Sequence, residues 1–123
     1  MSGINLLTDT NIILYLLGGD RDIAGILSGR IVHLSFINEL ELLSFPQLSS
    51  EDAQIIREFL KETIIIDINE SIKAHTIDLR TKYNLKLPDA IVAATAWFLQ
   101  IPLFTADRDF KKITEIPILY YEK

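Results

Sequence analysis

The fold class follows from one stretch near the N-terminus, residues 4–19, which reads Ile4-Asn5-Leu6-Leu7-Thr8-Asp9-Thr10-Asn11-Ile12-Ile13-Leu14-Tyr15-Leu16-Leu17-Gly18-Gly19. Residues 4–8 form a short apolar run typical of a buried strand. Residues 10–17 form a longer apolar run that is typical of a helix and that the glycine pair ends. A buried strand followed directly by a helix indicates an α/β protein, with Asp9 at the junction of the two elements.

The same alternation continues along the chain. We expect further strands at 31–35, 63–68, 102–105 and 117–121, and helices at 21–28, 37–45, 49–62, 69–83, 88–100 and 108–113. Strands that are continuously apolar and that alternate with helices indicate a mostly parallel sheet covered on both faces. The expected fold is a three-layer α/β/α sandwich, and a chain of 123 residues and 14.0 kDa is expected to form one domain over residues 1–123.

Composition and charge limit the functional classes. The chain has no cysteine, which excludes disulfides and thiolate metal sites and fits the cytoplasm, where we expect the protein. The apolar N-terminal stretch is too short to span a bilayer and lacks a basic leader, so no membrane partner is expected. The net charge of −5 is the opposite of the usual balance in nucleic-acid binders, although basic residues gather in the C-terminal half, beside Asp89 and Asp107.

Four acidic residues occupy positions that a chain ordinarily gives to loop or core residues: Asp9, Glu41, Asp89 and Asp107. Asp9 follows the first expected strand and Asp107 the fourth, so both should lie at the carboxyl edge of the sheet, where ligands bind at a topological switch point. If all four carboxylates converge, they form a site for a hard cation such as Mg²⁺, which prefers oxygen ligands and acidifies water. The corresponding function is that of a metal-dependent nuclease.

Three of the acids also have a purely structural interpretation, which for Asp107 is a turn or a helix cap. Asp9 is a good N-cap for the helix that follows it. Asp89, in the first turn of a helix behind Pro88, gains about 0.3 to 1 kcal/mol from the helix dipole alone. Glu41 lies in an apolar helix and is preferred as the site residue to Glu39, which falls on a different face; a rotated helix would reverse that choice.

Other polar residues are expected to support the site. Asn11 can hold a carboxylate or a water, Thr105 ends a strand beside Asp107, and Asp109 is a peripheral second acid. Two cations that flank the acids are predicted to contact substrate phosphates: Lys86 and Arg108. The histidines, His33 and His75, do not have metal-ligand spacing. Four apolar residues are candidates either for a partner surface or for ordinary core: Leu42, Leu43, Phe45 and Leu48.

The acids lie in four local motifs, which occur in order along almost the whole chain: Thr-Asp-Thr-Asn around Asp9, Ser-Phe-Ile-Asn-Glu-Leu-Glu-Leu around Glu41, Leu-Pro-Asp-Ala-Ile-Val-Ala-Ala-Thr-Ala around Asp89, and Leu-Phe-Thr-Ala-Asp-Arg-Asp-Phe around Asp107. Together they closely resemble the motifs of PIN-domain ribonucleases, in particular the VapC-type toxins of prokaryotic toxin–antitoxin pairs. Asn11 matches the polar residue of the first motif and Thr105 the hydroxyl residue of the last. The chain departs from the pattern at Asn38, where the family commonly has Ser or Thr.

The resemblance implies a Rossmann-like fold and a Mg²⁺- or Mn²⁺-dependent endoribonuclease whose products carry 5′-phosphate and 3′-hydroxyl ends. It assigns metal binding to Asp9, Asp89 and Asp107, with Glu41 as a further ligand or as the holder of the attacking water. It also implies a homodimer and a cognate antitoxin whose peptide covers the site.

Two other interpretations remain open at this stage. A PIN-like scaffold that only binds partners would keep the fold without the chemistry. A haloacid-dehalogenase-like phosphatase would also place an Asp after the first strand, but it needs a second Asp two residues later, where this chain has Asn11.

Overall fold

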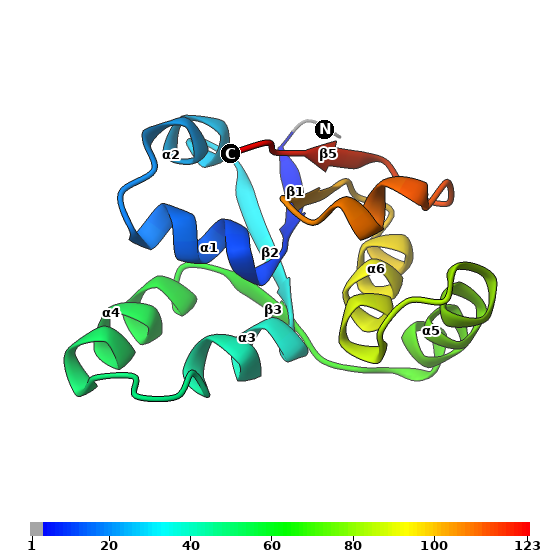
Figure 1. Ribbon diagram of the computed structural model, residues 1–123, viewed down its shortest axis with the longest axis horizontal. Coiled ribbons are helices and arrows are strands. Elements are labelled where there is room, and N and C mark those ends of the chain that lie inside the picture. The colour runs from blue at the N-terminus through cyan, green and yellow to red at the C-terminus, as the bar shows by residue number, and fades with distance from the viewer. Residues whose placement is uncertain (1–3) are drawn as a thin grey trace.

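A computed structural model describes residues 4–123 of the chain (Figure 1). Within these residues, strands and helices alternate as expected from the sequence. In chain order the elements are β1 Asn5–Thr8, α1 Thr10–Leu17, α2 Arg21–Leu27, β2 Ile31–Ser35, α3 Phe36–Leu43, α4 Ser50–Leu60, β3 Ile64–Ile66, α5 Glu70–Tyr83, α6 Leu87–Leu99, β4 Leu103–Thr105, the 3-10 helix η1 Arg108–Lys112, and β5 Ile118–Tyr120.

The five strands form one parallel sheet with the order β3-β2-β1-β4-β5. The central strand β1 pairs with β2, where Leu7 is level with His33, and with β4, where Leu7 is level with Leu103. Successive strands are added on one side of β1 up to β3 and on the other side from β4 onward. The switch point therefore lies between β1 and β4, where a parallel sheet leaves a crevice at its carboxyl edge.

Helices cover both faces of the sheet, which confirms the three-layer α/β/α architecture: α1 to α4 lie on one side and α5, α6 and η1 on the other (Figure 1). Side chains alternate along each strand. Leu6 and Phe104 pack with α1 and α2, whereas Leu7 and Leu103 pack with α5 and α6. A third cluster, around Leu34, joins α1, α3 and α4. This packing fixes the strand ends that carry the acids.

Sequence signals set several helix boundaries. Ser49 caps α4 by accepting from the Asp52 N–H, and Asn69 caps α5 by accepting from the Ile72 N–H. Gly19 ends the turn after α1 with φ 98°, a left-handed conformation that favours glycine. No helix in the described part of the chain is both long and apolar enough to cross a membrane.

The differences from the expected elements are local. The expected strand at 63–68 is only Ile64–Ile66, because β3 is an edge strand that pairs with β2 alone. The sequence alone predicts that the aromatic residues Trp97, Phe98 and Phe104 belong to the core. Phe104 is buried, but Phe98 is 40% exposed on α6, so the prediction is wrong for Phe98. Of the four apolar candidates for a partner surface, Leu42 is fully buried and belongs to the core, and Leu43 and Leu48 are partly buried. Phe45 is 43% exposed.

Candidate metal centre

Asp9 lies at the carboxyl end of β1 and is almost completely buried. Its N–H donates to the carbonyl oxygen of Phe104 over 3.0 Å, so the residue is level with the end of β4. Its Oδ1 accepts from the N–H of Thr10 at 2.8 Å, and its Oδ2 accepts from the hydroxyl of Thr105 at 3.0 Å. The helix-cap interpretation of Asp9 is therefore geometrically correct, yet the same residue lines the acidic cleft that β1, α1, α3 and α6 surround.

Burial raises the pKa of Asp9 from 3.8 to about 6. The hydrogen bonds from Thr10 and Thr105 favour the charged form and oppose this rise, while the negative charges of Asp89 and Glu41 add to it. A carboxylate that is buried among other carboxylates is costly to ionise. A cation at this position would remove that cost.

Glu41 reaches the same cleft from α3. Its Oε1 accepts from the hydroxyl of Thr10 at 2.6 Å, and Thr10 Oγ1 in turn accepts from the side-chain amide of Asn38 at 3.0 Å. Glu41 lines the cleft, whereas Glu39 is not among its lining residues. The geometry therefore favours Glu41 over Glu39, as the helical spacing indicated.

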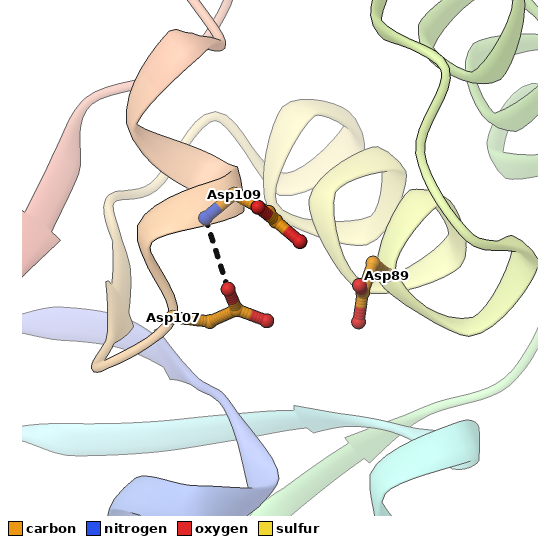
Figure 2. A group of neighbouring side chains, drawn as sticks. All are labelled: Asp89, Asp107 and Asp109. Carbon is orange, nitrogen blue, oxygen red and sulfur yellow. Dashed lines mark hydrogen bonds between the residues drawn. The ribbon is translucent and has the colours of Figure 1, made fainter.

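Three further carboxylates face one another at the starts of η1 and α6. Asp89, Asp107 and Asp109 each offer an oxygen, and these oxygens lie within 4.8 Å of one another (Figure 2). Asp107 caps η1 by accepting from the Asp109 N–H at 2.9 Å, and its own N–H donates to Thr105 Oγ1 at 3.0 Å. Asp109, expected to be peripheral, is thus a full member of this group, because the turn of η1 directs its side chain toward Asp89.

The acids form one electrostatic cluster. Burial raises the pKa of Asp89, and the charges of Asp107, Glu41 and, more weakly, Asp109 raise it further, while Lys86 lowers it. Asp89 and Asp9 also line one cleft of about 350 Å³ together with Glu41. The structure therefore brings all four expected acids to the switch point, in two adjoining groups that share Asp89.

The residues that were expected to support the site differ in their burial and in their contacts. Thr105 is fully buried and links Asp9 to the backbone of Asp107, as a strand-end hydroxyl should. Asn11 is exposed at the rim of the cleft. Lys86 is exposed at the N-cap of α6 and close enough to affect the pKa of Asp89. Arg108 is also exposed, but its guanidinium interacts with Tyr120, which raises the pKa of Arg108.

Thr10 and Asn38 have defined contacts at the site. From the sequence, Asn38 is expected near the site, where it can orient other groups, and Thr10 is expected only as a helix cap; the bonds that join them to Glu41 were not expected. Their polar atoms are tied to Glu41 and to the start of α3 rather than to solvent. The sequence signal was a hydroxyl directly after the first acid and an amide three residues before the second. Each of these residues is also explained by its place at the start of a helix, so the sequence gives no reason to expect a bond between them.

The donor set fits a hard divalent cation. All candidate ligands are carboxylate oxygens, and none is a sulfur or an imidazole nitrogen. Mg²⁺ and Mn²⁺ prefer such oxygen ligands. Burial raises the pKa of both Asp9 and Asp89, and the neighbouring negative charges raise each pKa further, so a cation bound between them would favour their ionised forms.

Comparison with known protein families identifies the family of this chain. The family model for the PIN domain matches residues 6–116, a range that includes all four acids and, apart from Asn5, the strands β1 to β4. The chain belongs to the PIN-domain family. The expected membership of the PIN-domain family is thereby confirmed, and solved structures share this fold.

Among solved structures, a toxin–antitoxin complex from Klebsiella pneumoniae contains a chain that is 32% identical, with a TM-score of 0.81 over 94% of this PIN chain and 98% of that chain. VapBC2 from Rickettsia felis, bound to a DNA fragment from its promoter, matches with a TM-score of 0.81 at 20% identity over 96% and 99% of the two chains. FitAcB from Neisseria gonorrhoeae matches with a TM-score of 0.74 at 22% identity over 92% and 95%. Among curated proteins, none matches this sequence.

Proposed function

We propose that this PIN-domain chain is a VapC-type toxin: a Mg²⁺- or Mn²⁺-dependent endoribonuclease that hydrolyses RNA phosphodiester bonds to 5′-phosphate and 3′-hydroxyl ends. The observation that carries the proposal is the convergence of carboxylates from β1, α3, α6 and the start of η1 at the switch point of a PIN fold. A bound cation would offset the repulsion among these carboxylates, since like charges about 4 Å apart repel by about 4 kcal/mol at an effective dielectric near 20.

The proposed roles follow from the positions of the side chains. Asp89, Asp107 and Asp109 are the most closely grouped carboxylates and would hold the cation together with Asp9. Glu41, which has one oxygen bound to Thr10, would hold the water that attacks phosphorus. A bound Mg²⁺ or Mn²⁺ supplies positive charge against the phosphate and acidifies water.

RNA is proposed as the substrate despite the acidic composition. Lys86 stands at the rim of the acidic group and is exposed, so its ammonium is available to a phosphate of the substrate. Arg108 is the weaker candidate because its guanidinium interacts with Tyr120. A small number of phosphate contacts predicts modest affinity and a shallow dependence on salt.

The proposed partners are a cognate antitoxin and a second copy of the chain, in the cytoplasm. The 32% identical structure is itself a toxin–antitoxin complex. An apolar groove of about 410 Å³, lined by Leu14, Leu17, Phe45, Leu48, Ile55 and Ile56 among others, adjoins the acidic cleft and shares Phe45 and Pro46 with it. An antitoxin peptide could occupy this groove and reach the acids from it.

The proposal is tested with purified protein and an end-labelled single-stranded RNA pool, in EDTA and in Mg²⁺ or Mn²⁺. Cleavage should require the metal, and Asp89→Asn should lower the rate by at least about 100-fold, as expected for loss of a metal ligand. Asp78→Asn, the same charge change at an exposed position on α5, is the matched control.

Two outcomes would contradict the proposal. Metal uptake and a stable fold without RNA cleavage would favour a PIN-like binding scaffold. Hydrolysis of a phosphomonoester in place of RNA would favour a phosphatase, although the exposed Asn11, at the position where such an enzyme needs its second Asp, is a poor replacement.

A further inference from the structure

A chain of hydrogen bonds connects the start of α3 to the acidic cleft. The backbone N–H of Ser35 donates to Asn38 Oδ1 at 3.0 Å, the amide of Asn38 donates to Thr10 Oγ1 at 3.0 Å, and the hydroxyl of Thr10 donates to Glu41 Oε1 at 2.6 Å. Asn38 is fully buried and Thr10 nearly so. The series joins the N-terminus of α1 to the face of α3 that carries Glu41, and it is called the relay here.

The direction of the relay is determined by the donors available. A backbone N–H can only donate, so the oxygen of the Asn38 amide must face Ser35 and its NH₂ group must face Thr10. The Thr10 hydroxyl accepts this bond, and its single proton is then free for Glu41. Every link is therefore a donor followed by an acceptor.

The relay orders Glu41 specifically. Within residues 4–123, Thr10 is the hydrogen-bond partner of the Glu41 side chain, and the bond occupies Oε1. Glu41 also lines the cleft that contains Asp9 and Asp89. A glutamate side chain has three rotatable bonds, and one short hydrogen bond to a buried hydroxyl removes most of that freedom.

We propose that Thr10 and Asn38 are positioning residues of the site: they hold one oxygen of Glu41 so that its other oxygen is directed at the reacting water or cation. Thr10 serves two acids at once, since its backbone N–H binds Asp9 and its hydroxyl binds Glu41. The inference rests on the proposed ribonuclease function for its effect on turnover, but not for the existence of the relay.

The first test compares Thr10→Val, which replaces the hydroxyl with a methyl group of similar size, with Thr10→Ser, which keeps the hydroxyl. Cleavage of an end-labelled single-stranded RNA pool in Mg²⁺ should show kcat lowered by about 10 to 100-fold in Thr10→Val, with KM within about twofold. Thr10→Ser should restore most of kcat. Equal kcat in Thr10→Val and the original protein, or equal impairment in both variants, would overturn the proposal.

Thr76→Val is the matched control. Thr76 is as buried as Thr10, its hydroxyl donates to the carbonyl oxygen of Ile72 within α5, and it does not line the cleft. It should keep the original kcat. The same loss in both valine variants would show that removing any buried hydroxyl impairs the protein and would overturn the positioning role.

Asn38→Asp tests the direction of the relay. The new carboxylate has the shape of the amide but no donor, so it draws the Thr10 hydroxyl toward itself and away from Glu41. The expected result is a loss of kcat similar to that of Thr10→Val. If charge alone mattered, the variant would bind Mg²⁺ more tightly and keep its kcat, and that outcome would contradict the relay.

A measurement on the metal-free protein separates this inference from the proposed function. The side-chain NH₂ resonances of Asn38 in a ¹H–¹⁵N spectrum should shift in Thr10→Val and stay in place in Thr76→Val. If the original protein fails to cleave RNA, the ribonuclease proposal fails, and shifted resonances still establish the relay. Unmoved resonances in Thr10→Val overturn the relay whatever the activity.

Discussion

The substitution Asp9→Asn should stabilise the metal-free protein at neutral and alkaline pH. The pKa of Asp9 is raised from 3.8 to about 6 because the side chain is buried. The folded protein therefore binds this proton more tightly than the unfolded chain does. The resulting stability is complete below pH about 4 and is lost as the pH rises through about 6.

The magnitude follows from the size of the shift. A rise of about 2 pKa units corresponds to about 3 kcal/mol, the cost of ionising Asp9 in the folded state at pH 8. An asparagine avoids this cost. Its oxygen can still accept from the Thr10 N–H, and its NH₂ group can donate to Thr105 Oγ1, where the carboxylate accepted a bond. The variant should therefore be more stable by about 2 to 3 kcal/mol at pH 8 and nearly equal at pH 4.

Urea unfolding in EDTA at several values of pH between 4 and 8 measures this difference. Asp78→Asn removes the same charge from an exposed position on α5 and should show no comparable dependence on pH. The reasoning would be refuted if the free energies of unfolding of the original protein and of Asp9→Asn changed in parallel with pH across this range. Such a result would mean that Asp9 ionises at no cost to the stability of the fold.

Three other expectations concern metal, substrate and packing. Mg²⁺ at about 100 times its Kd should raise the free energy of unfolding by about 2.7 kcal/mol, with a larger effect at pH 8 than at pH 5 because protonated Asp9 binds cations poorly; thermal unfolding checks this. Lys86→Ala should raise KM at unchanged kcat and lower the salt slope of RNA binding by about 1, measured by titration at several ionic strengths. Phe110→Ala should cost about 3 to 5 kcal/mol in urea unfolding, since the Phe110 side chain of η1 is fully buried.

The order of elements could be predicted from the sequence because strand and helix signals agreed locally. Apolar runs of strand length, glycines after helices and polar caps each fall where the structure has a boundary. The predictions fail where contacts between distant segments determine the length of an element or the burial of a residue. The strand after residue 63 is short because an edge strand has one partner, and Phe98 is exposed because α6 meets the core along its alanine-rich side.

The candidate site was predictable to the level of topology. Asp9 and Asp107 follow neighbouring strands, so their proximity could be predicted from the position of the switch point alone. The importance of Asp109 was not predictable, because it depends on the turn of η1, and η1 is held by the buried Phe110. Asn38 is linked to Glu41 through Thr10, which lies 28 positions from Asn38 and 31 positions from Glu41. Sequence periodicity carries no information about contacts between residues so far apart.

The bond between Asp9 and Thr105 joins positions separated by 96 residues. A ribosome makes β1 long before β4, the strand that completes the crevice. Nascent chains that lack β4 also lack Asp107 and Asp109, so they cannot assemble the carboxylate group. The candidate metal centre can therefore form only after β4 has joined the sheet beside β1.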